Sequence, residues 1–112
     1  MISVLKSKIH RAVVTECDLN YEGSISVDEA WLKLAEIREF EQVDVLNITN
    51  GNRFTTYAIK AEKGTKKIGI NGAAARLATV GDLVIILSYR HIEEKQTTPK
   101  PIIFIPEHYD KV

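Results

Sequence analysis

Residues 42–61 read QVDVLNITNGNRFTTYAIKA, and this stretch decides the fold class. Asn50-Gly51 is the strongest short-range signal for a β-hairpin, because both residues tolerate the positive φ angles of a tight turn. The flanking stretches, 42–49 and 52–61, are rich in β-branched and aromatic residues, as strands are. The sequence therefore predicts two antiparallel strands joined at Asn50-Gly51.

Outward from this hairpin, the chain reads mostly as short strands. Residues 2–15 are rich in β-branched residues and alternate in places, which favours a long first strand. A second Asn-Gly pair, Asn71-Gly72, leads into an alanine run that predicts one or two helical turns over 73–78. The remaining strands are expected at 24–27, 67–70, 83–89 and 102–105.

One short helix is expected over about 28–36. Either the Ser26 to Glu29 capping box or Asp28 offers its N-cap. Helical periodicity would place Trp31, Leu34 and Ala35 on one apolar face.

These elements predict a mainly β protein with short helices. Six or more short strands in 112 residues favour a closed barrel over a sandwich. That length is typical of one domain, so we expect residues 1–112 to form a single unit.

Composition narrows the classes of partner. Lys plus Arg and Asp plus Glu each number 15, so the chain has no broad positive charge for nucleic acid. Its longest aliphatic run, 83–87, is far shorter than the roughly 20 residues that cross a bilayer. Charges occur where a signal peptide needs its apolar region. We therefore expect a cytoplasmic protein that binds neither nucleic acid nor membrane.

The histidines and the cysteine of the sequence do not form a recognisable catalytic or metal-binding motif. His10, His91 and His108 are far apart in sequence and have no carboxylate at metal-ligand spacing, so no metal site is expected. Cys17 is the only cysteine, which rules out an internal disulfide, and it reads as a buried apolar thiol.

The Gly23-Ser24 pair has two readings. Gly and Ser are common turn residues, and taken alone the pair is a turn. In the second reading, the Ser24 hydroxyl attacks the unobstructed Gly23 carbonyl and forms an ester, provided that the fold supplies strain and oxyanion donors. Elimination and hydrolysis would then cut the chain and leave a pyruvoyl ketone at the new N-terminus.

The second strand of the hairpin carries another candidate group. A period of two places Arg53, Thr55 and Tyr57 on one face, where an arginine and a tyrosine could hold a carboxylate and supply a proton. A solvated strand face explains the same pattern. Lys8 and His10, on one face of the first strand, allow the same two interpretations.

Five motifs occur in one order along residues 1–90, and together they resemble those of a known family. They are Lys8-Ile-His10-Arg11, Tyr21-Glu22-Gly23-Ser24, Asn50-Gly51 with Arg53-Phe-Thr-Thr-Tyr57-Ala-Ile, Asn71-Gly72-Ala73-Ala74-Ala75 and Val80-Gly81-Asp82. The combination closely resembles the aspartate 1-decarboxylases, pyruvoyl enzymes that make β-alanine for pantothenate and coenzyme A synthesis.

This resemblance implies a fold and a maturation step. The family forms a six-stranded double-psi β-barrel and assembles as a homotetramer with active sites between subunits. Cleavage between Gly23 and Ser24 would give a β chain of residues 1–23 and an α chain of residues 24–112. Ser24 would become the covalent pyruvoyl cofactor, with no metal and no pyridoxal phosphate. A partner protein that assists maturation belongs to the same expectation.

The resemblance also implies roles for the matching residues. Thr56 would hold the Gly23 carbonyl during cleavage and later contact L-aspartate, and Tyr57 would be the proton donor. Further matches are Arg53 and Lys8 at the substrate carboxylates, Gly72, Ala73 and Ala74 along the substrate, and His10, Asn71 and Tyr21 as supporting residues. Two positions depart from the pattern: Leu46 stands where many relatives carry tryptophan, and Arg76 where histidine is common.

Two alternatives remain from the residues themselves. One is a non-enzymatic barrel module, an adaptor or nucleic-acid-binding domain, in which Gly23-Ser24 is only a turn. Neutral charge and 7% aromatic residues disfavour its nucleic-acid version. The other is a family member that lost processing and acts as a regulator, which the presence of Ser24, Thr56 and Tyr57 disfavours.

Overall fold

The computed structural model describes residues 1–109, and strands dominate it. Six strands have four or more residues: β1 (Ile2–Val13), β3 (Ser24–Asp28), β4 (Gln42–Asn47), β5 (Arg53–Ala61), β6 (Ile68–Asn71) and β7 (Leu83–Ile92). Two strands of three residues each, β2 (Glu16–Asp18) and β8 (Ile102–Phe104), are added to them. The expected mainly β class with short helices is confirmed.

The strands form one sheet in the order β2-β6-β3-β5-β4-β7-β1-β8. Its first member, β2, follows β1 in the chain after only Val14 and Thr15. Thr15 donates its backbone N–H to the Ile68 carbonyl at 2.8 Å, and its hydroxyl accepts from the Ile68 N–H at 3.0 Å. The segment β1–β2 therefore pairs with β7 at one end and with β6 at the other, which brings the two ends of the strand order together.

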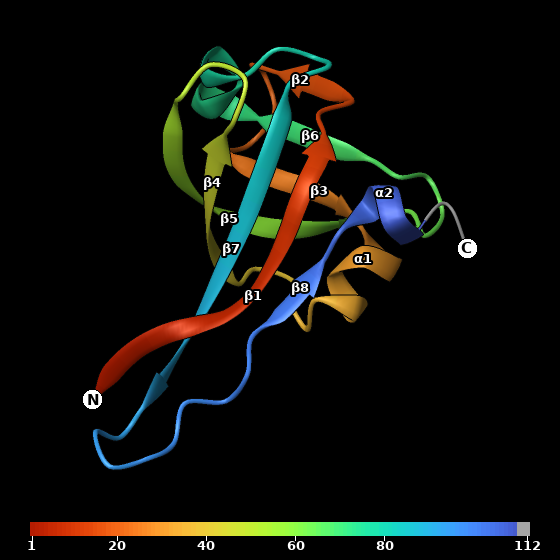
Figure 1. The fold of residues 1–112 in the computed structure, drawn as a ribbon. Coiled ribbons are helices and arrows are strands. Elements are labelled where there is room, and N and C mark those ends of the chain that lie inside the picture. Colours follow the sequence, from red (N-terminus) through yellow and green to blue (C-terminus); the bar gives the residue numbers. More distant parts are fainter. Residues whose placement is uncertain (110–112) are drawn as a thin grey trace.

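Figure 1 shows β1 and β7 side by side as a long antiparallel ribbon that extends away from the rest of the sheet toward the N-terminus. The ribbon is irregular at two places, between Leu5 and Ser7 and between His10 and Ala12. At the second of these Arg11 has a φ of 64°. Such bulges bend a strand, so β1 changes direction while it stays paired with β7 as far as Val13.

Apolar side chains from all parts of the sheet fill the interior. The pattern follows the strand period of two: Val43 and Val45 are buried, whereas Gln42 is exposed and Asp44 and Leu46 are half-buried. Among the largest fully buried side chains are Ile9, Ile25, Ile68, Ile70 and Ile86.

The Asn50-Gly51 hairpin forms as predicted, with β4 and β5 antiparallel and Gly51 at a φ of 80°. However, β4 ends at Asn47, two residues earlier than expected. The reason is local: the Asn47 side-chain oxygen accepts from the backbone N–H of Thr49 at 3.0 Å and of Asn50 at 3.3 Å. These bonds turn the chain before the Asn-Gly pair.

The helix predicted over 28–36 is shorter, α1 (Glu29–Leu34). Asp28 is its N-cap and accepts from the Ala30 N–H at 2.8 Å, which decides between the two expected caps. Trp31 and Ala35 are buried as expected, but Leu34 is 44% exposed. The buried side of α1 carries Trp31 and Leu32 and continues to Ala35, so it is rotated toward Leu32 and away from Leu34.

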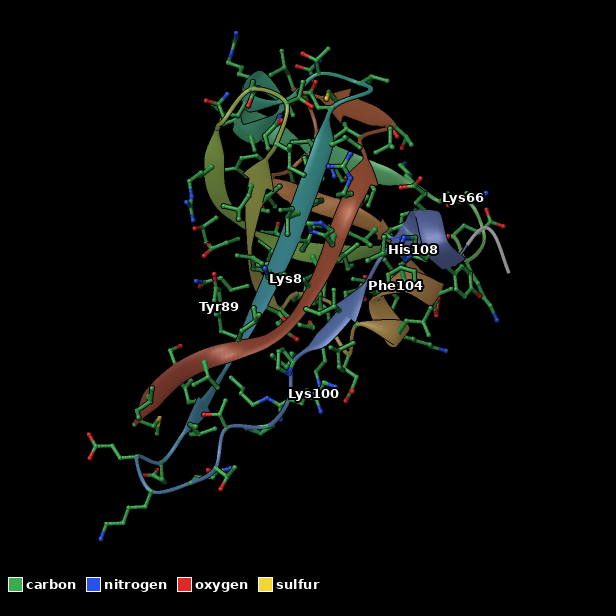
Figure 2. All side chains as sticks on the ribbon, in the orientation of Figure 1. Lys8, Lys66, Tyr89, Lys100, Phe104 and His108 are labelled. Atoms are coloured by element: carbon green, nitrogen blue, oxygen red, sulfur yellow. The ribbon has the colours of Figure 1, made fainter. Side chains whose placement is uncertain are left out.

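The other short elements lie at the ends of the barrel. The helical turns predicted at the alanine run form as a 3-10 helix, η1 (Gly72–Leu77). Two elements were not predicted from the sequence: β2, and the helix after β8, α2 (Pro106–Tyr109). Figure 2 shows Phe104 of β8 at this end, where its ring lies 6.0 Å from that of Trp31 and 5.6 Å from that of Tyr109.

Candidate active site

The Gly23-Ser24 junction lies where the loop after β2 enters β3. Gly23 is exposed, whereas Ser24 is the first residue of β3 and only 1% exposed. The Ser24 hydroxyl donates to the Glu22 carbonyl at 3.1 Å and accepts from the Asn71 side-chain amide at 3.0 Å. The hydroxyl is therefore turned back toward the peptide that precedes the junction.

Gly72 packs directly against this loop. A Cβ built on Gly72 would lie 2.7 Å from the Gly23 Cα and 3.2 Å from the Tyr21 carbonyl oxygen. Gly72 also has a φ of 75°, which L side chains rarely adopt. Only glycine meets both conditions at this position, so Gly72 fixes how closely η1 approaches the junction.

The register of β5 brings a second predicted pair beside the junction. Strands β3 and β5 run parallel with Ile25 opposite Ala58. Because parallel partners run in the same direction, the residues before Ile25 lie beside the residues before Ala58, namely Thr56 and Tyr57. The ladder begins directly after Ser24 and Tyr57, so these two residues lie on neighbouring strands.

A pocket of about 290 Å³ opens onto this junction, and both Ser24 and Tyr57 line it. The Tyr57 ring lies 6.2 Å from the ring of Phe40, a residue with a positive φ of 68° in the loop before β4. The remaining lining residues are Tyr21, Glu22, Glu39, Ile59 and Lys60.

Arg53, Lys8 and His10 lie on the outer face of the β1–β7–β4–β5 part of the sheet, the face that Arg53 shares with Tyr57 by the strand period of two. The registers align Arg53 with Leu46, Leu46 with Ile85, and Ile85 with His10 in one row across four strands. Lys8, labelled in Figure 2, belongs to the next row. Arg53 is exposed, and Lys8 and His10 are half-buried. None of these three residues lines the Ser24–Tyr57 pocket.

Asp44 organises the same outer face. Its two carboxylate oxygens accept from the Thr55 hydroxyl at 2.7 Å and from the Tyr89 hydroxyl at 2.9 Å. Partial burial and the bond to Asp44 raise the pKa of Tyr89 above its ordinary value, against an opposing effect of Arg53. Arg53 and Asp44 line one small cavity of about 160 Å³.

The other predicted positions lie close to the junction or on η1. Asn71 is buried and sits opposite Ser24 in the β3–β6 register. On η1, Ala73 is exposed, Ala74 packs against the core and Arg76 is exposed. Tyr21 is 54% exposed at the mouth of the pocket.

Cys17 differs from the expected buried thiol. It is half-buried on β2, and its thiol donates to the Ala78 carbonyl at 3.4 Å. Burial and the nearby carboxylates of Asp82 and Glu16 raise the pKa of Cys17, which disfavours the nucleophilic thiolate.

Ser26 was missed at the sequence level although it touches the predicted site. It lies two residues after Ser24 on the same strand face, and its hydroxyl accepts from Asn71 at 3.0 Å. The period of two in a strand was the signal that could have found it. Across residues 1–109, no three His, Cys, Asp or Glu side chains are grouped to hold a metal ion.

The family model for aspartate decarboxylase matches residues 1–112 of this chain. The chain belongs to the aspartate decarboxylase family. Three aspartate 1-decarboxylases illustrate the similarity: the Maricaulis maris protein is 51% identical over 99% of this chain and 93% of its own length. The Kosmotoga olearia protein is 53% identical over 96% of this chain and 93% of its own length. The Thermoanaerobacter pseudethanolicus protein is 52% identical over 94% of this chain and 92% of its own length.

Solved structures are also similar to this member of the aspartate decarboxylase family. The rationally designed mkDPBB_sym1 protein aligns with a TM-score of 0.49 at 19% identity, over 76% of this chain and 96% of its own. The computationally designed msDPBB_sym2 protein aligns with a TM-score of 0.48 at 18% identity, over 78% of this chain and 99% of its own. In residues 1–109, no helix has the length and apolar character needed to cross a membrane.

Proposed function

We propose that this chain decarboxylates L-aspartate to β-alanine and carbon dioxide, which supplies pantothenate and coenzyme A synthesis. Family membership supports the reaction, and one observation supports the location of the site. Ser24, the residue expected to mature, and Tyr57, the expected proton donor, line one pocket. We assign this pocket as the part of the active site that one chain contributes.

Maturation begins at the Gly23-Ser24 bond. The Ser24 oxygen bonds to the Gly23 carbonyl carbon, the carbon–nitrogen bond breaks, and the hydroxyl proton ends on the Ser24 nitrogen. Elimination then removes the Ser24 Cα proton and breaks the Cβ–oxygen bond, so Gly23 leaves as a carboxylate. Water replaces the nitrogen, which departs as ammonia and leaves a ketone. The products are residues 1–23 and a pyruvoyl-headed chain of residues 24–112, two parts of one domain.

The residues around Ser24 fit this chemistry. Gly23 carries no side chain to obstruct the attack, and a Cβ placed on it would meet nothing within 4 Å. The Ser24 hydroxyl already faces the preceding peptide, 3.1 Å from the Glu22 carbonyl. Thr56, which precedes Tyr57 on β5, would hold the Gly23 carbonyl oxygen.

A pyruvoyl group supplies a ketone that binds the substrate amine and withdraws electrons as carbon dioxide leaves. The chain's own side chains must then deliver one proton to the product. Tyr57 lines the pocket of Ser24 and carries a hydroxyl that can donate it. Asn71, whose amide reaches the Ser24 position, would hold an oxygen of the bound substrate. On η1, Gly72, Ala73 and Ala74 would line the substrate.

Recognition of the two substrate carboxylates needs a second copy of the chain. Arg53 lies four residues before Tyr57 on an extended strand, which separates their Cα atoms by about 13 Å. Lys8 lies three strands away from Thr55 along one row, about 14 Å. A neighbouring subunit that presents Arg53, Lys8 and His10 to the Ser24 pocket would complete the site, in keeping with the proposed homotetramer.

Intact mass under denaturing conditions tests this proposal, before and after prolonged warming. We expect two fragments split at Gly23-Ser24, the longer one lighter than its encoded mass by one ammonia. Cleavage that occurs only after addition of cell extract would establish the proposed maturation partner. A chain that stays whole in both conditions would contradict the proposal and favour the non-enzymatic barrel module. Cytoplasmic location remains part of the proposal.

A further inference from the structure

The Asn71 side chain bridges two serines of β3. Its amide nitrogen donates to the Ser24 hydroxyl and to the Ser26 hydroxyl, each at 3.0 Å. All three residues are buried, with exposures of 4% for Asn71, 1% for Ser24 and 7% for Ser26. A side-chain amide has two N–H groups, so both are used. Ser26 has no part in the function proposed above.

The bond to Ser26 decides how the Asn71 amide is turned. The terminal torsion of an asparagine has a broad, weak preference, so hydrogen bonds must fix the amide plane. With one N–H held by Ser26, the other N–H points at the Ser24 oxygen. That oxygen then directs its own hydrogen to the Glu22 carbonyl. The order Ser26, Asn71, Ser24, Glu22 is one continuous set of hydrogen bonds, buried from Ser26 to Ser24 and part-buried at Glu22.

The fold leaves room for a hydroxyl at position 26. Ser26 sits opposite Gly69 in the β3–β6 register. A Cβ on Gly69 would lie 3.4 Å from the Ser26 Cβ and 3.6 Å from its hydroxyl oxygen. On its open side, Ser26 lines a pocket of about 290 Å³ together with Asn71. A slightly larger side chain that keeps the hydroxyl therefore has space.

We propose that Ser26 is a positioning residue for self-cleavage: its hydroxyl orients the Asn71 amide, which holds the Ser24 oxygen against the Glu22–Gly23 side of the junction. The inference rests on the proposed cleavage at Gly23-Ser24. Ser26 makes no bond to the reacting atoms itself, so its effect passes through Asn71. Without it, the amide turns and the attacking oxygen loses its fixed direction.

The test follows cleavage in full-length chains made by cell-free translation, sampled over time by intact mass. Ser26→Ala should slow cleavage roughly tenfold, the effect expected from loss of one buried hydrogen bond at the reacting group. Ser26→Thr keeps the hydroxyl, places its methyl toward the pocket and should restore the rate. Ser88→Ala is the matched control, because Ser88 is fully buried and its hydroxyl bonds to that of Ser7 at 2.5 Å, on the β1–β7 ribbon.

The Tm of each variant, measured by thermal unfolding, shows whether slower cleavage comes from a less stable fold or from loss of the Asn71 orientation. Slow Ser26→Ala cleavage, restored in Ser26→Thr and normal in Ser88→Ala, supports the inference. Unchanged cleavage in Ser26→Ala overturns it, and so does equal slowing in Ser26→Ala and Ser88→Ala or a failure of Ser26→Thr to restore the rate. An unaltered chain that never cleaves overturns the proposed function, and the inference with it.

Discussion

Gly72 lies against Gly23 so closely that a Cβ on Gly72 would be 2.7 Å from the Gly23 Cα and 2.8 Å from its nitrogen. The two glycines are 49 positions apart in the chain, yet their backbones meet at the bond expected to break. The contact couples the position of η1 to the conformation of the junction, and it yields the first prediction.

Gly72→Ala should disturb both folding and self-cleavage. We expect the free energy of unfolding to fall by about 2–5 kcal/mol, because of the positive φ and the overlap with Gly23. Cleavage, followed by intact mass, should be slower. Gly51→Ala is the matched control, since Gly51 has a φ of 80° but a Cβ placed on it would meet nothing within 4 Å. It should lose about 1–2 kcal/mol and cleave normally. Equal behaviour of the two variants would contradict a role for the contact.

Tyr57→Phe should separate maturation from turnover. The variant keeps its ring against Phe40 but loses the hydroxyl, so cleavage should proceed while kcat falls roughly 100-fold or more. The measurement is carbon dioxide release from aspartate, divided by the fraction of processed chain. Tyr109→Phe, which removes a hydroxyl on α2 outside the Ser24 pocket, should retain most of the activity. Full activity in Tyr57→Phe would mean that another group donates the proton.

Arg53→Lys should weaken aspartate binding more than maturation. Lysine keeps the charge but loses the forked pair of bonds that arginine makes to a carboxylate. We expect KM for aspartate to rise about tenfold or more, with near-normal cleavage in a mass time course. If KM and cleavage change by the same factor, Arg53 supports the fold rather than the substrate.

Alkaline stability should depend on Tyr89. Because the pKa of Tyr89 is raised in the folded state, the unfolded chain loses this proton first. The stabilisation is present below pH about 10, the unfolded pKa, and is lost as the pH rises through the folded pKa. Between about pH 8 and pH 11, roughly the span around that pKa, the free energy of unfolding in urea should fall less steeply with pH for Tyr89→Phe than for the unaltered chain. Tyr109→Phe, at the α2 end of the molecule, controls for the loss of a phenol; identical slopes in the two variants would contradict the prediction.

Asp28 should be the polar side chain on which the fold most depends. It is 1% exposed, and its carboxylate accepts from the backbone N–H groups of Ala30, Gly64 and Lys66 at 2.8, 3.1 and 2.8 Å. Asp28→Ala leaves these donors without that acceptor and should cost about 2–4 kcal/mol in urea unfolding. Asp28→Asn keeps one acceptor oxygen and should lie between. A loss below about 1 kcal/mol in Asp28→Ala would show that water replaces the carboxylate.

The sequence alone determined the local structure well, because its signals were local. Asn50-Gly51 fixed the hairpin, the apolar run after Gly81 fixed β7, and Asp28 capped α1. Misjudged positions depended on side-chain bonds or on which side of a short helix meets the core. Asn47 ended β4 early through its own amide oxygen, and Leu34 is exposed because α1 buries Leu32 instead.

Motif order also determined the family and the candidate residues, but only the tertiary structure decided which of them meet. The parallel pairing of β3 with β5 brings Tyr57 to Ser24, and the β3–β6 pairing brings Asn71 to both Ser24 and Ser26. Strand order and register place Arg53 and Lys8 outside the Ser24 pocket, farther along the outer face. A sequence pattern records which way a side chain points along its own strand, whereas pairing between distant strands sets its neighbours.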